Sequence, residues 1–266
     1  MSISGHPMGV NLFLHSVRLV MGDWRNALRI TGLLYLIYAV PTFVFALLFP
    51  ARTDPGQVIE NAGSNGVVAL ITGILAIVAF VWIAVAWHRY VLLDEVPAGP
   101  LPEFDGRRLL SYTGYSLLLG IIGFALSFVI SAIVGSVAVP LLNVFGAVIT
   151  GLLALAAMLL VGYRLAPILP AVSVGKKLTL AQAWEATKDA NGPLIILAVI
   201  SAVASFVIDI PALVLAMAGP IGGFLGMLWV LVTGWVKMIV GVSILTTLYG
   251  HYVEGRAIPS RSAGVI

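Results

Sequence analysis

The sequence has no cysteine, and only 9% of its 266 residues are charged. The absence of cysteine excludes disulfides, thiolate metal sites and cysteine nucleophiles. Soluble domains carry about 25% charged residues, so a chain with this few cannot cover a water-facing surface. Because 61% of the residues are hydrophobic, lipid is the expected solvent for most of the chain.

Signatures of catalysis and of nucleic-acid binding are also missing. No serine lies in a GxSxG nucleophile elbow, and His15, His88 and His251 lack metal-ligand spacing, so we interpret them as interfacial side chains. The net charge is only +3, and the basic residues flank apolar segments instead of forming a separate basic face. We therefore expect no enzyme activity, no cofactor, no metal and no nucleic-acid partner.

Six apolar segments are each long enough to cross a membrane as a helix, since a hydrocarbon core of about 30 Å needs roughly 20 apolar residues. The fold class that we predict is all-α: a single integral membrane domain over residues 1–266, built as a polytopic bundle of six transmembrane helices. Charge-free turns around Pro140 and over residues 219–223 join the last four segments into two hairpins. The six predicted spans cover residues 30–49, 67–87, 116–139, 141–161, 194–218 and 224–249.

The basic residues are concentrated on one side of these spans. Twelve of the fourteen Lys and Arg residues lie before the first span or after the second, fourth and sixth. By the positive-inside rule we expect both termini in the cytoplasm, and the excess of Arg over Lys is typical of a GC-rich bacterium, which favours the bacterial inner membrane. Eight of these residues are expected to contact anionic lipid on that face: Arg18, Arg25, Arg89, Arg107, Arg108, Arg164, Lys176 and Lys177.

Two segments on the same side have the pattern of amphipathic helices. Residues 8–28 carry apolar side chains at helical spacing, and residues 179–190 begin with a capping box formed by Thr179 and Gln182. Such helices are expected to lie in the plane of the headgroups. Each precedes a helix out and a helix back, so the chain has a possible threefold repeat of helical hairpins.

One stretch carries a resemblance to known proteins. Residues 163–170 read Tyr-Arg-Leu-Ala-Pro-Ile-Leu-Pro and lead to residues 180–188, Leu-Ala-Gln-Ala-Trp-Glu-Ala-Thr-Lys. This is similar to uncharacterised bacterial six-span inner-membrane proteins, namely the YciC-like family and the membrane domain attached to some glycerophosphodiester phosphodiesterases. The resemblance implies an all-helical membrane module. It carries over no active site, because the six spans leave no room for a phosphodiesterase domain.

Asp209 and Lys237 are charged residues inside apolar spans, where a charge costs roughly 2.5–3.5 kcal/mol on insertion scales. If the last two spans form a hairpin, the two side chains lie at similar depth, so we predict an intramembrane ion pair. The pair is either a lock on the hairpin or a site for an ion, a proton or a charged group. Pro211 and Pro41 are candidate helix kinks, since proline removes a backbone hydrogen bond.

Small residues at four-residue spacing predict close contact between the third and fourth spans. Ser127, Ser131 and Gly135 form one ridge. The facing ridge consists of Gly146, Thr150 and Ala154, and Gly222 and Gly226 form a GxxxG pair at the start of the sixth span.

The first hypothesis for function is a non-enzymatic inner-membrane protein that acts as a scaffold, as an accessory subunit of a membrane-protein partner or in envelope lipid homeostasis. The alternative is a small transporter or channel that uses Asp209 and Lys237. A third hypothesis, an intramembrane enzyme, lacks a nucleophile or an acid/base pair in a suitable arrangement.

Overall fold

The computed structural model describes residues 7–48 and 62–258, and within these residues the protein is helical without any strand. Six of its helices are long and apolar enough to cross a membrane, namely α2, α4, α5, α6, α9 and α10. The all-α prediction is confirmed, and the six helices are consistent with a multi-pass membrane protein. The helices are α1 (Met8–Met21), α2 (Trp24–Leu48), α4 (Ala62–Leu93), α5 (Gly106–Leu142), α6 (Val144–Leu165), α7 (Ile168–Ser173), α8 (Leu180–Ala186), α9 (Asn191–Ala216) and α10 (Gly219–Tyr252).

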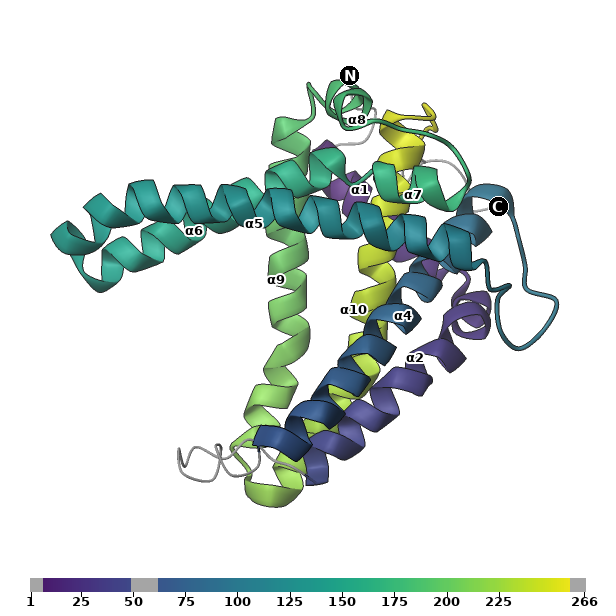
Figure 1. Cartoon of the computed structure of the whole chain (residues 1–266), viewed down its shortest axis with the longest axis horizontal. Helices are drawn as coiled ribbons and strands as arrows, with labels where there is room; N and C mark the ends of the chain where they lie inside the picture. Colours follow the sequence, from purple (N-terminus) through teal and green to yellow (C-terminus); the bar gives the residue numbers. More distant parts are fainter. Residues whose placement is uncertain (1–6, 49–61, 259–266) are drawn as a thin grey trace.

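The long helices pack as three pairs of sequence neighbours: α2 with α4, α5 with α6 and α9 with α10. Figure 1 shows that α2, α4, α9 and α10 extend between the same two ends of the molecule, and we call them the four-helix group. The α5–α6 hairpin instead crosses this group near its upper end and projects beyond it (Figure 1). The middle hairpin therefore runs in a different direction from the α2–α4 and α9–α10 pairs.

The contacts of the α5–α6 hairpin explain its direction. Leu119 and Ile122, in the first half of α5, pack against a cluster that contains Ile168 of α7 and Ala183 of α8. The last part of α6 contacts α8 and α9. The outer half of the hairpin has exposed apolar side chains, such as Phe128 at 65%. Only the base of the hairpin is thus attached to the other helices.

One end of the four-helix group carries most of the basic side chains, and we call it the basic end. It holds Arg89, Arg164, Lys176 and Arg256. Hydrogen bonds donated by these side chains connect the ends of α4, α6 and α10 with the segments around α7 and α8. The opposite end, which we call the turn end, holds the α9–α10 turn (Figure 1). Arg52 and Arg261 lie outside the described residues.

The amphipathic lead-ins are shorter than predicted. Helix α1 ends at Met21 instead of continuing to residue 28, because Gly22 and Asp23 turn the chain before α2. The Asp23 carboxylate accepts hydrogen bonds from Tyr90 of α4 and from Asn26, and such local bonds compete with helix continuation. The predicted capping box at Thr179 is present, and α8 ends at Ala186.

Two turns are displaced from their predicted positions. Pro140 lies inside α5, and the chain turns at Asn143, which has a φ of 51°. Asparagine adopts positive φ more readily than most residues, which explains why the turn is there. Helix α10 begins at Gly219 instead of residue 224, so the turn consists of Met217 and Ala218.

Polar side chains connect the helices inside the four-helix group. Trp87 of α4 donates to Ser243 of α10 at 2.7 Å, and the His88 ring contacts the Thr246 hydroxyl at 2.7 Å. His88 is fully buried, so its interpretation as an interfacial side chain is wrong. Trp235 of α10 donates to Thr31 of α2 at 2.9 Å. These bonds fix α10 between α2 and α4.

Candidate functional site

The structure brings Asp209 and Lys237 together. The Lys237 Nζ donates to the Asp209 Oδ1 at 2.6 Å. The Asp209 side chain is 38% exposed, and the Lys237 side chain is 27% exposed. The pair is therefore formed between neighbouring helices but is not sealed inside the protein. A group in the surrounding space can approach both charges.

The position of the α9–α10 turn determines how the pair forms. Asp209 lies seven residues before the end of α9, whereas Lys237 lies eighteen residues after the start of α10. Lys237 is thus deeper from the turn end than Asp209, so the prediction that the two residues lie at similar depth is wrong, because the turn is nearer to Asp209 than expected. Side chains lean toward the N-terminus of their helix, so the long lysine side chain extends toward the turn end and reaches the carboxylate.

A cavity of about 310 Å³ lies beside this pair, and we call it the α9–α10 groove. Its lining includes Lys237 of α10 and Ser201 and Ser205 of α9, together with Tyr163 at the end of α6. Phe13, Val17 and Met21 of the amphipathic helix α1 also line it. The groove thus extends from α1 at the basic end to the intramembrane lysine.

The polar side chains of α9 form one stripe. Ser201, Ser205 and Asp209 are spaced four residues apart and therefore share a helix face. The Ser201 hydroxyl lies near that of Tyr163 but makes no hydrogen bond of good geometry, although its oxygen is buried. Buried polar atoms are normally satisfied, so this hydroxyl needs a partner, which either Tyr163 or a polar group in the groove would supply.

Within the described part of the chain, Lys237 is the one charged residue that lines the groove, and Asp209 pairs with it from beside the cavity. Apolar side chains such as Ile208, Val240 and Ile244 form the rest of the wall. The arrangement suits a molecule with an apolar body and one hydrogen-bonding or negatively charged group.

The predicted kinks and ridges occupy clear positions. Pro211 lies inside α9, two residues after Asp209, and Pro41 lies inside α2, and both helices continue through their proline. The two small-residue ridges of α5 and α6 face each other: the Ser127 Oγ lies 3.5 Å from the Ala154 carbonyl oxygen. A Cβ at Gly135 would contact Thr150 at 3.4 Å.

The eight basic residues predicted at the lipid face divide into three groups. Arg164 is buried, contrary to a role in headgroup contact: its guanidinium donates to Asn191 and Lys188 and stacks over the Trp184 ring. Arg89 and Arg108 form ion pairs with acidic residues. The remaining five are exposed, namely Arg18, Arg25, Arg107, Lys176 and Lys177.

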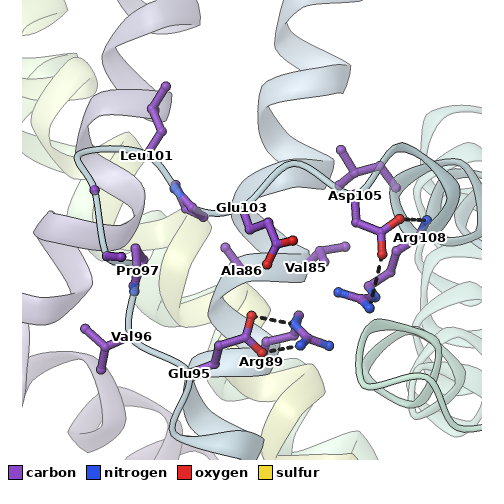
Figure 2. A pocket seen from close by; sticks show the side chains of 14 residues that line it. Val85, Ala86, Arg89, Glu95, Val96, Pro97, Leu101, Glu103, Asp105 and Arg108 are labelled. Atoms are coloured by element: carbon purple, nitrogen blue, oxygen red, sulfur yellow. Dashed lines mark hydrogen bonds and ion pairs between the residues drawn. The ribbon is translucent and has the colours of Figure 1, made fainter.

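A second cavity, of about 400 Å³, lies at the basic end under the loop between α4 and α5. Figure 2 shows the carboxylate of Glu95 against Arg89, and Asp105 against Arg108. Glu103 extends into the space between these pairs (Figure 2). Because both arginines of its described lining are already neutralised, this part of the structure offers no free cation for a lipid phosphate.

No protein-family model, curated protein or solved structure matches the chain. Across residues 7–48 and 62–258, no three His, Asp or Glu side chains form a group that could hold a metal ion.

Sequence reasoning found the ion pair but missed the groove. The four-residue spacing of Ser201, Ser205 and Asp209 was a usable signal, since it places three polar side chains on one face of an apolar helix. The contributions of α1 and Tyr163 had no such signal, because they depend on how distant segments pack.

Proposed function

We propose that the protein is a non-enzymatic inner-membrane protein that binds a membrane amphiphile in the α9–α10 groove and acts in envelope lipid homeostasis. The observation that carries this proposal is the polar stripe of α9: Ser201 and Ser205 line the groove, and Asp209 pairs with Lys237, which lines it too. The amphiphile that fits this lining has an apolar chain and a carboxylate or hydroxyl group.

The energetics of polar groups in lipid support the proposal. A hydroxyl without a hydrogen bond is costly in an apolar environment, and lipid chains cannot supply one. A carboxylate or hydroxyl in the groove would satisfy Ser201 and interact with the Lys237 ammonium. The apolar walls would bury the attached chain.

The place of α1 supports entry from the basic end. This helix lines the groove with Phe13, Val17 and Met21, while Arg18 on its exposed side remains available to headgroups. An amphipathic helix of this kind lies at the boundary between headgroups and acyl chains. An amphiphile from the adjacent leaflet would therefore meet the groove at the level of its own polar group.

A second candidate function is transport that uses Asp209 and Lys237. The incomplete burial of the pair favours it, because an ion or a charged group in the surrounding space can reach both charges. Pro211 beside the pair also provides a point where α9 can bend.

Native mass spectrometry of the protein in mild detergent tests amphiphile binding. Ser205→Leu fills the groove with a larger apolar side chain and should remove a retained lipid that the wild type carries. Val203→Leu is the matched control, since Val203 is 56% exposed on the same helix. Retention of the lipid by Ser205→Leu, or its loss from both variants, would contradict the proposal.

A charge series separates the two functions. Asp209→Asn and Lys237→Met each leave one unpaired charge, which should lower the folded fraction, and the double variant should restore it. If Lys237 alone binds the amphiphile, the folded fraction of the Asp209→Asn variant should still retain lipid. A double variant that folds, binds lipid normally and yet loses flux of a substrate in vesicles would favour the transporter instead.

A further inference from the structure

A separate cavity of about 250 Å³ lies at the basic end, on the other side of α1 from the α9–α10 groove. It is lined by His15 of α1, by His251 of α10 and by Arg256 of the segment that follows α10. Thr246 and Thr247 of α10 also line it, and α4 contributes only Val91 and Leu92. Among the residues that the structure describes, no carboxylate lines this cavity.

The basic groups of this cavity are held in place by bonds that leave donors free. Arg256 donates from Nε to Glu254 at 2.7 Å and from Nη2 to the Leu92 carbonyl at 3.1 Å. A guanidinium has five N–H donors, so others remain for a ligand. The His251 Nδ1 lies 3.2 Å from the Arg256 carbonyl oxygen, which leaves its Nε2 for another partner.

The charges around the cavity favour an anion. Arg18 lies one turn from His15 on α1, and Lys176 pairs with Glu254, which also contacts Arg256. Lys176 and Arg256 thus share one carboxylate, and Arg18 adds a third cation beside His15. Arginine with histidine is a chemistry that binds phosphate oxygens through charge-assisted hydrogen bonds.

We propose that the cavity formed by His15, His251 and Arg256 binds a phosphate-type oxyanion, supplied by a lipid headgroup or by a free phosphate compound. The site is independent of the amphiphile in the α9–α10 groove, since the two cavities share no lining residue. Burial first, and then the nearby Arg18 and His251, lower the pKa of His15 from its ordinary 6.5. A bound anion would oppose this effect, so binding should take up a proton and strengthen as the pH falls toward 6.

Histidine NMR of the full chain tests the site, with inorganic phosphate as one probe and nanodiscs of phosphatidic acid or phosphatidylcholine as the other. The signals of His15 and His251, assigned with His15→Gln and His251→Gln, should shift on binding. Arg256→Gln should weaken binding about tenfold, the effect of losing a charge-assisted hydrogen bond. Lys177→Gln removes an exposed cation at the same end and should leave the affinity for inorganic phosphate unchanged.

The two probes distinguish the sources of the anion. Shifts with inorganic phosphate in detergent identify a free oxyanion, and shifts only in phosphatidic acid nanodiscs identify a headgroup. Equal weakening by Lys177→Gln and Arg256→Gln would show a general surface-charge effect and overturn the proposal. So would unshifted histidine signals with both probes, or full affinity in His251→Gln and Arg256→Gln variants that retain the wild-type melting temperature.

Discussion

The four-helix group and the α5–α6 hairpin hold their helices together by different means. In the four-helix group, hydrogen bonds such as Trp87–Ser243 and Trp235–Thr31 connect separate helices. In the hairpin, small residues let two backbones approach, and a Cβ at Gly146 would lie 2.0 Å from the Ala138 carbonyl oxygen. Both are known ways to associate helices where lipid weakens the hydrophobic drive.

The difference indicates which region can carry a site. Hydrogen-bonded helices hold side chains in fixed positions, and the groove and the ion pair both belong to that region. The outer hairpin exposes apolar side chains on its outer faces and has no charged side chain between residues 124 and 158. We therefore expect specific binding in the four-helix group and nonspecific lipid contact along the hairpin.

The largest expected effect is a difference in thiol labelling between the α5–α6 turn and the α9–α10 turn. The chain has no cysteine, so Asn143→Cys and Met217→Cys each introduce a single thiol. Because the hairpin tip does not reach the turn end (Figure 1), a membrane-impermeant thiol reagent that labels Met217→Cys from one side should leave Asn143→Cys unlabelled. Equal labelling of both turns from that side would mean that the hairpin lies parallel to the four-helix group in the membrane.

Gly146→Leu should open the hairpin. Its side chain would collide with the backbone of α5 at Ala138. Overpacking typically lowers the free energy of unfolding by about 1–3 kcal/mol, and we expect the upper end of this range because a backbone cannot move aside easily. Gly151→Leu is the control on the same helix, since a Cβ there meets nothing within 4 Å. Thermal unfolding in detergent measures both, and equal stability of the two variants would contradict the close approach.

Ser243→Ala tests the hydrogen-bonded region in the same assay. It leaves the buried Trp87 indole N–H without its acceptor, which should lower the free energy of unfolding by about 1–3 kcal/mol. Ser136→Ala removes an exposed hydroxyl of the hairpin that bonds only within its own helix, and should have little effect. A larger loss of stability in Ser136→Ala than in Ser243→Ala would show that polar contacts do not distinguish the two regions.

The smallest expected effect is a pH dependence from His15. Its folded pKa is lowered below 6.5, chiefly by burial, so the unfolded state binds more protons as the pH falls through that range. Stability should therefore be greatest above pH 6.5 and decrease below it. His15→Gln should flatten this part of the profile in pH-dependent melting, and an unchanged profile would mean that His15 is not desolvated.

Sequence reasoning predicted what depends on length and local pattern. The six apolar helices, the Thr179 capping box and the facing ridges of α5 and α6 all follow from local composition or spacing. The contact between Asp209 and Lys237 followed from a hairpin of neighbouring spans. The direction of the α5–α6 hairpin did not follow, because it is set by contacts of its base with α7 and α8. His88 was likewise unpredictable, since its partners lie on α5 and α10.

A photoactivatable fatty acid tests most directly whether the four-helix group contains a specific amphiphile site. After irradiation of the protein in membranes with this probe, peptide mass spectrometry identifies the modified residues. We predict modification concentrated around Ser201, Ser205 and Lys237, decreased by Ser205→Leu and preserved in Val203→Leu. Modification spread evenly over the exposed α5–α6 hairpin and the α9–α10 groove, and insensitive to Ser205→Leu, would contradict the account.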